Sequence, residues 1–251
     1  MKSIQVYIDS KQQEFMNHPF FKELEKLDSI EEISYFVPEL TFWAMTFQDI
    51  LRINEEKVTD PYLKKIARHH RLEDAGHDKW FLHDKAYLGN KLNNQCKNDD
   101  VAWLYSNETQ LTRDAAYAIM SEIYKSEDER INIALLLTLE SSGHVFFEKV
   151  VNQVKKTGEN DNLKYFSSTH LDVELAHAIF EEEMEAKMFA MKVPVDVRRQ
   201  ALQMVDRCYI AFNKMFDGLL TALTHRLNVA QQQAAANHPY DDKVEVKQEA
   251  V

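Results

Sequence analysis

Hydrophobic residues recur along most of the chain at spacings of three and four, the period of one face of an α-helix. Only five glycines and five prolines interrupt this pattern, too few for the many turns of a β-sandwich, barrel or propeller. The pattern predicts an all-α fold, a compact bundle of seven to eight helices. The helices are expected at residues 4–16, 17–24, from Asp28 or Ser29 through a kink at Pro38, and at 60–89, 109–125, 127–156, 169–191 and 194–228.

No internal repeat and no long linker divides this run of helices, so residues 1–228 are expected to form a single helical domain. The remaining residues, 229–251, are polar and hold few large apolar groups, which predicts a flexible tail.

Composition narrows the classes of function. Hydrophobic residues make up 45% of the chain, as in globular proteins, and the net charge of −11 argues against nucleic acid as a partner. The two cysteines, Cys96 and Cys208, form neither a metal-finger spacing nor a disulfide framework. Without an apolar signal core or a membrane-spanning run, the sequence predicts a cytoplasmic protein with no membrane partner.

Three of the expected helices carry acids and imidazoles on faces that are otherwise apolar. In the segment SSTHLDVELAHAIFEEE, His170, Glu174 and His177 are four and then three residues apart and share a stripe with Phe180 and Met184. Other glutamates of the segment supply the solvated face. Two imidazoles and a carboxylate on one inward stripe favour metal ligation.

The expected helix at 127–156 repeats this pattern. Glu140 interrupts the strongly apolar run ALLLTLESSGHVFF, and His144 follows one turn later. An ionised carboxylate in such surroundings needs a compensating cation, hydrogen bond or proton. For Glu140 alone, a hydrogen-bonded buried carboxylate explains the pattern as well as a ligand does, and His144 can be a ligand, a neighbour of a ligand or a core histidine.

The expected helix at 60–89 holds the third stripe, with His70, Glu73 and His77 between Ile66 and Trp80. Glu73 and His77, four residues apart, also suit a simple surface pair. Taken together, however, the three helices indicate a shared metal site. Imidazoles and carboxylates without thiolates suit iron, manganese or zinc, and helical bundles hold dinuclear centres with such ligands.

This set of residues resembles that of the haem-oxygenase-like di-iron oxidases, which share the haem oxygenase and thiaminase (TenA-like) helical fold. The resemblance rests on a Glu and a His on one helix, a Glu on a later helix, and the His-x3-Glu-x2-His segment that follows. The early NHPFFKELEKL and the aromatic YFVPELTFWAMTFQDIL segments also resemble these folds. The similarity covers residues 10–225 or so, and the His-x3-Glu-x2-His helix is its most specific part.

The resemblance implies a non-haem di-iron oxidase or oxygenase that uses O₂ on a small amine, amino acid or fatty acid. It implies two Fe²⁺ ions, with Mn as an alternative, and catalytic roles for Glu140 and Glu174 as bridging carboxylates. The implied metal ligands are Glu73, His77, Glu140, His170, Glu174 and His177, with His144 and His70 as further candidates. A dry aromatic wall is expected from Trp43, Phe47, Trp80, Phe81, Phe147 and Phe180.

The chain departs from this family at His70, which lies seven residues before His77 and leaves the register of that helix open. It departs from TenA-like enzymes because neither Cys96 nor Cys208 falls on a middle helix, and a haem ligand at His18 would leave three carboxylates unexplained. The competing hypotheses are a TenA-like protein that binds or hydrolyses a small molecule without metal, a ferritin-like di-iron protein, and an interaction scaffold. Relatives of the fold often form dimers, so the sequence leaves open whether this chain forms a homodimer.

Overall fold

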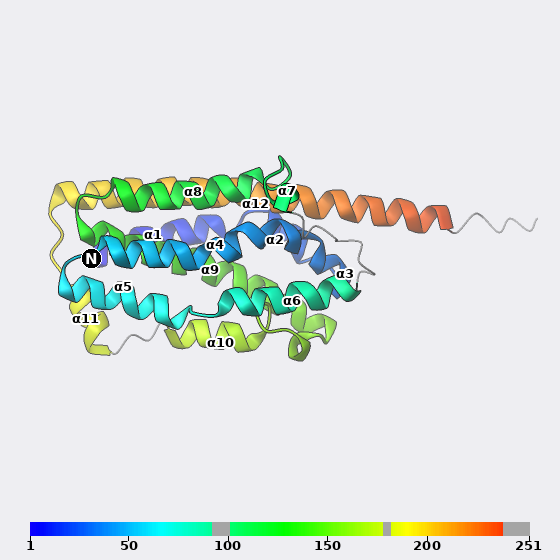
Figure 1. The fold of residues 1–251 in the computed structure, drawn as a ribbon, viewed down its shortest axis with the longest axis horizontal. Coiled ribbons are helices and arrows are strands. Elements are labelled where there is room, and N and C mark those ends of the chain that lie inside the picture. Colours follow the sequence, from blue (N-terminus) through cyan, green and yellow to red (C-terminus); the bar gives the residue numbers. More distant parts are fainter. Residues whose placement is uncertain (92–100, 178–181, 238–251) are drawn as a thin grey trace, which may run out of the picture.

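The computed structural model describes residues 1–91, 101–177 and 182–237, and the side chains of residues 174–177, 182, 183 and 185 lie outside the described part. All its regular elements are helices, arranged as an elongated bundle in which long helices run roughly side by side (Figure 1). This confirms the all-α bundle that the hydrophobic pattern predicts.

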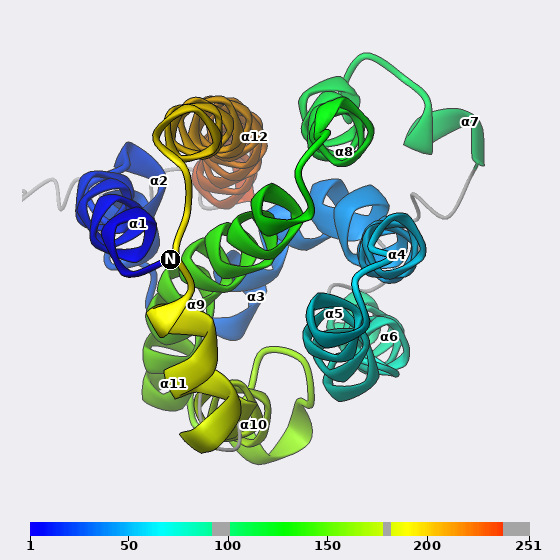
Figure 2. The same ribbon diagram turned by 90° about the vertical axis from the view of Figure 1, so that its left-hand side faces the viewer.

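α9 (Glu129–Thr157) lies at the centre of the bundle when it is viewed end-on (Figure 2). It packs against α1 (Lys2–Phe15), α12 (Val195–Asn237), α5 (Pro61–Glu73) and α10 (Ser168–His177). Its apolar residues point to several neighbours at once, which explains why its sequence is hydrophobic on most sides.

Polar residues at the helix ends account for where several helices start and stop. The Asp60 carboxylate accepts hydrogen bonds from the backbone N–H groups of Tyr62 and Leu63 and so caps α5, with Pro61 at its first position. Ser29 caps α3 (Ile30–Ile33) by accepting from the N–H of Glu32. α9 starts at the Asp128 cap and ends at Gly158, whose φ of 77° suits glycine.

The short elements at the N-terminal side are α2 (Pro19–Leu24), α3 and the 3-10 turn η1 (Ser34–Phe36), which leads into α4 (Val37–Lys57). Pro38 therefore sits in the first turn of α4 rather than at a kink inside a longer helix. Proline is tolerated there because the first backbone N–H groups have no partner within the helix.

The expected single helix at 60–89 is wrong, because the structure breaks it into α5 and α6 (His77–Lys91). Gly76 adopts a φ of 100°, a conformation that ends a helix and that L-residues other than glycine disfavour. Asp74 lies just before this break and His77 just after it.

The C-terminal half also differs from the expected boundaries. Within the expected helix at 169–191 the structure describes α10 and α11 (Glu182–Ala190), and residues 178–181 lie outside the described part. α12 continues to Asn237, past the expected end at 228. The first residues of the expected tail are therefore helical, and α12 projects beyond the bundle (Figure 1). α7 (Val101–Leu104) and α8 (Gln110–Lys125) complete the elements, with α8 packed on α4 and α12.

Candidate metal centre

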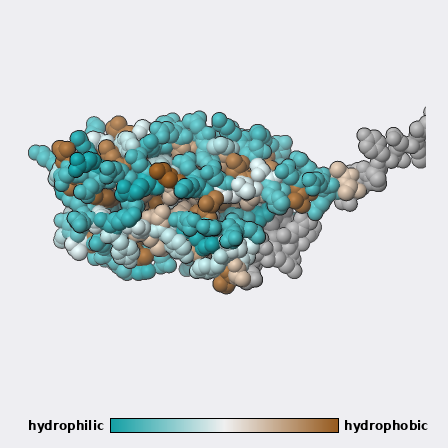
Figure 3. Space-filling model, turned by 90° about the horizontal axis from the view of Figure 1, so that it is seen from above, coloured by the Kyte–Doolittle hydropathy of each residue, from teal (hydrophilic) through white to brown (hydrophobic). Residues whose placement is uncertain are grey.

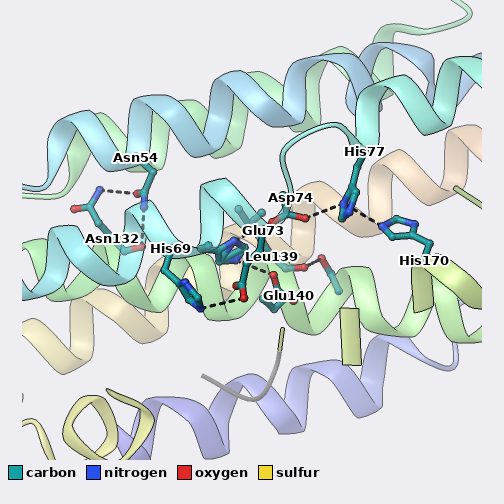
Figure 4. Close-up of polar contacts among 11 residues, drawn as sticks. Asn54, His69, Glu73, Asp74, His77, Asn132, Leu139, Glu140 and His170 are labelled. Carbon is teal, nitrogen blue, oxygen red and sulfur yellow. Dashed lines mark hydrogen bonds and ion pairs between the residues drawn. The ribbon is translucent and has the colours of Figure 1, made fainter. Parts of the chain in front are cut away.

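His70, Asp74 and Glu140 bring one ligand atom each to within 4.8 Å of one another. His70 lies in the last turn of α5. Asp74 follows at the C-cap of α5, and Glu140 comes from the middle of α9 (Figure 4). His70 and Asp74 are buried and Glu140 is partly buried. Among the described residues this is the group of acids and imidazoles with the spacing that a metal ion needs.

His70 lies between two carboxylates. Its Nδ1 lies 3.0 Å from Asp74 Oδ2, and its Nε2 lies 2.8 Å from Glu140 Oε1. A neutral imidazole carries one proton and can donate to only one of two carboxylates. A metal ion or a further proton between His70 and Glu140 would relieve the repulsion between lone pairs.

His77 and His170 continue this network on the far side of Asp74. His77 Nδ1 lies 3.1 Å from Asp74 Oδ1 and 3.1 Å from His170 Nε2 (Figure 4). His170 Nδ1 lies 2.7 Å from the Tyr165 carbonyl oxygen, which can only accept, so this nitrogen carries the proton. The Nε2 of a neutral His170 therefore faces inward as a lone pair, the arrangement typical of metal-bound histidines.

A cavity with mainly aromatic and aliphatic walls adjoins these groups. Asp74, His77, Glu140 and His170 line one part of it, and Trp43 and Phe47 of α4, with Phe146 and Phe147 of α9 and Phe212, Met215 and Phe216 of α12, line the rest. Trp80 packs against the rings of His77 and His170, at centroid distances of 4.9 and 5.6 Å. Such walls keep water away and strengthen electrostatic interactions within the site.

The structure places the sequence-predicted residues in different ways. His77, Glu140, His170 and the additional candidate His70 lie in the connected network described above. Glu73 lies outside the three-residue group, and its carboxylate is 3.0 Å from His69 Nε2. His144 is half-buried and lies outside the three-residue group. Glu174 and His177 belong to α10 by their backbone, but their side chains lie outside the described residues.

The expected aromatic wall is found in part. Trp43, Phe47 and Phe147 line the cavity, Trp80 covers the imidazoles, and Phe81 is fully buried in the core. Phe180 lies outside the described residues.

Sequence reasoning missed Asp74, which connects His70 to His77 through its two carboxylate oxygens. On a continuous helix Asp74 lies four residues after His70 and three before His77, so it shares their stripe with Glu73. The stripe alone does not choose between these two acids. The signal for its true position is Gly76 two residues later, because a glycine inside a helical pattern often marks an end.

The histidine that could bind haem and the cysteine that a TenA-like enzyme would use have other contacts in this structure. His18 caps α2, its Nδ1 accepting from the N–H of Phe20, and its Nε2 lies 3.3 Å from Asp217. Cys208 is fully buried in α12, and burial raises the pKa of its thiol, which suits a structural cysteine and not a nucleophile. Cys96 lies outside the described residues.

No protein-family model matches the chain, and no curated protein matches it significantly. Among solved structures, it is similar to a domain of unknown function with a heme oxygenase-like fold from Shewanella denitrificans OS217. The TM-score is 0.58 and the sequence identity 13%, and the match covers 95% of this chain and 96% of the other. The chain has a haem oxygenase-like fold. At this identity the haem oxygenase-like match concerns the fold alone, so the chemistry has to be argued from the site.

The surface adds little to this picture. Within the described residues, no helix has both the length and the apolar character needed to cross a bilayer. The face shown in Figure 3 is largely hydrophilic, with apolar residues scattered over it. The cytoplasmic location stays a prediction.

Proposed function

We propose that the chain is a metal-dependent oxidase or oxygenase of the haem-oxygenase-like di-iron type, acting with O₂ on a small organic substrate. The observation that carries this proposal is the convergence of His70, Asp74 and Glu140 from two helices beside an aromatic cavity. Their donor set of imidazole and carboxylate fits Fe²⁺ or Mn²⁺, since neither needs thiolate ligands. When bound, iron would supply the electrons for reducing O₂.

We assign the metal-holding role to His70, Asp74, Glu140, His77 and His170, with Glu174 and His177 as further ligands implied by the family resemblance. This differs from the sequence expectation in three respects, because Glu73 is left out, the further candidate His70 is included, and Asp74 is added. The three ligand atoms lie within 4.8 Å of one another. Ligands about 2.1 Å from a shared ion are at most about 4.2 Å apart, so binding an ion would draw the three side chains together.

The chain's own residues orient this donor set. Asp74 holds His70 and His77 in fixed rotations through one oxygen each. The Tyr165 carbonyl fixes the tautomer of His170. Glu140 and Glu174 remain the candidates for bridging carboxylates, and the aromatic walls would exclude water from a substrate bound next to them.

The first test measures metal in protein expressed with added iron, by elemental analysis and Mössbauer spectroscopy. We expect more than about one equivalent of iron in the wild type, and a loss of at least about tenfold in iron affinity for His70→Ala and Glu140→Ala. Glu73→Ala is the matched control, since Glu73 lies one residue from Asp74 yet pairs with His69. It should keep its iron. Less than one equivalent, unchanged in the His70 and Glu140 variants, would contradict the proposal.

The second candidate is a metal-free, TenA-like protein that binds a small molecule. The observation in its favour is that the same acids and imidazoles already contact one another from Glu140 through to the Tyr165 carbonyl. Thermal stability separates the two. A chelator should lower the melting temperature of an iron protein, whereas it should leave the melting temperature of a metal-free binding protein unchanged. Oxygen uptake by the ferrous protein, followed with an electrode, then tests the oxidase activity itself.

A further inference from the structure

Gly143 lies in the middle of α9, a 29-residue helix. Glycine is among the least favourable residues in a helix interior, so its presence there usually has a local reason. One such reason is a positive φ, which Gly76 and Gly158 have and Gly143 does not. Another is a close neighbour, as at Gly218, where an added Cβ would lie 3.3 Å from Leu111.

Gly143 shows neither reason. A Cβ added there would meet no heavy atom within 4 Å. Gly143 also lines the cavity of the candidate metal centre, on the same stripe of α9 as Leu139 and Phe147 and one turn from Glu140. The space in front of Gly143 is thus part of the cavity, next to the residues that we assign to the metal.

The residues that line this cavity are of two kinds. Acids and imidazoles, among them Glu140 and His170, lie beside aromatic side chains such as Trp43, Phe47 and Phe212. Among the described residues that line the cavity there is no lysine or arginine. A ligand suited to such walls has a polar end that reaches the cluster and an uncharged apolar body.

We propose that Gly143 determines the size of the ligand, by leaving room in the cavity for the apolar body of a small organic compound whose polar end faces Glu140 and His170. The inference rests on the proposed function in one respect, because that compound would be the substrate oxidised there. The binding itself needs neither iron nor O₂.

Linear alcohols from ethanol to octanol are suitable probes, since each has one neutral polar end and differs by one methylene. Titration calorimetry on the full chain should show an affinity that rises by up to about fourfold per methylene until the cavity is full, and then levels off. Gly143→Leu should move this break to a shorter alcohol and weaken octanol binding by at least about tenfold. Gly143→Ala should act in the same direction but more weakly.

Gly89 provides a matched control. It is a glycine of α6 whose added Cβ would likewise meet nothing within 4 Å, but it does not line this cavity. Gly89→Leu should leave alcohol binding as in the wild type. Circular dichroism melts should show that all variants fold, because leucine and alanine are better helix formers than glycine.

Three outcomes would overturn the inference: no alcohol binds to the wild type, Gly143→Leu binds the whole series like the wild type, or Gly89→Leu weakens binding equally. Iron content measured on the same preparations keeps the two proposals apart. Alcohol binding that depends on Gly143 in a protein that takes up no iron would contradict the oxidase and support this inference. Iron uptake by a protein in which Gly143→Leu leaves alcohol binding unchanged would support the oxidase and contradict this inference.

Discussion

Asp84 of α6 is fully buried, and its carboxylate accepts hydrogen bonds from the backbone N–H groups of Lys164 and Phe166. His83 Nδ1 lies 2.8 Å from the same carboxylate. These contacts hold the loop before α10, and Tyr165 in that loop orients His170 through its carbonyl. Asp84 thus supports the site without lying in it.

We expect Asp84→Asn to lower the free energy of unfolding by about 2 kcal/mol, because an amide nitrogen would replace one acceptor and face backbone donors in a buried place. Urea unfolding curves measure this loss. The exposed Asp172 is the control, and Asp172→Asn should change stability by less than about 0.5 kcal/mol. Equal effects of the two substitutions would show that the buried hydrogen bonds matter little.

At this scale the sequence indicates some site residues and hides others. Glu140 and His170 stand out because a charged or titratable group interrupts an apolar stripe. Asp84 does not interrupt an apolar stripe. It lies between His83 and Lys85, a pattern typical of an acid on the protein surface. Its role depends on a loop that is distant in sequence, and helical periodicity carries no information about such a contact.

The break between α5 and α6 decides which residues of this segment reach the site. Gly76 has a φ of 100° there, and Asp74 and His77 lie on either side of it. We expect Gly76→Ala to lower the free energy of unfolding by about 1 kcal/mol, because the Cβ of alanine makes a positive φ sterically unfavourable. It should also weaken iron binding by displacing His77.

Gly89→Ala in the regular part of α6 is the control for this substitution. It should raise the free energy of unfolding by up to about 1 kcal/mol, the ordinary preference of a helix for alanine. Both values come from denaturant unfolding, and iron uptake is measured in parallel. Opposite signs are expected for the two variants, and a stabilising Gly76→Ala would contradict the role given to the break.

Glu159 connects α6 with the turn that follows α9. Lys91, Tyr87 and Asn162 all donate to its carboxylate, and the hydrogen bond from Lys91 is the main cause that lowers its pKa from 4.5 to about 2. A lowered pKa in the folded state means that the stabilisation is fully present above pH 4.5 and is lost as the pH falls towards about 2.

Glu159→Gln should therefore be less stable than the wild type at about pH 7, and the gap should narrow below about pH 4.5 and close near the folded pKa. Urea midpoints at several pH values follow this change. A gap that stays constant down to about pH 2.5 would show that the charge of Glu159 is not involved.

Boundaries of elements follow from the sequence where a cap residue marks them. Ser29 and the Asp60–Pro61 pair give the starts of α3 and α5 directly. The sequence does not predict the break at Gly76, because hydrophobic residues keep the helical period on both sides of it. Periodicity carries no information about a local change of φ. The end of α12 was placed too early because its polar Gln and Ala residues still favour a helix.

Arg226 joins the far end of α12 to the N-terminal elements. Its guanidinium makes two contacts with the Glu39 carboxylate of α4, at 2.5 and 2.7 Å, and also donates to the Tyr35 carbonyl oxygen. Burial raises the pKa of Glu39 even though Arg226 acts in the opposite direction. The pair is largely desolvated, so losing one partner leaves a buried charge.

We expect Arg226→Met to lower the free energy of unfolding by about 3 kcal/mol, and the double variant with Glu39→Gln to recover part of that loss. Arg52→Met, which removes an exposed partner of Glu56, is the control and should cost less than about 1 kcal/mol. Chemical denaturation of the wild type, the Arg226→Met and Glu39→Gln single variants and the double variant gives the coupling energy between the two side chains. Additive effects of the two buried substitutions would contradict a tight pair.

At the scale of the whole molecule, the all-α class follows from the scarcity of glycine and proline together with the helical period. The assembly of the site does not follow as completely. Glu140 and His70 come from helices 70 residues apart in the chain, and their meeting depends on how α5 packs against α9. Helical wheels give faces but not the rotation and height at which two helices dock.

The interruption between α5 and α6 also bears on the order of folding. His70, Asp74 and His77 are neighbours in the chain, so their mutual contacts can form within a single helix–turn–helix segment before distant elements arrive. Glu140 and His170 join only when α9 and α10 dock. One half of the cluster is thus local in sequence, and the other half depends on contacts between helices that are distant in the chain.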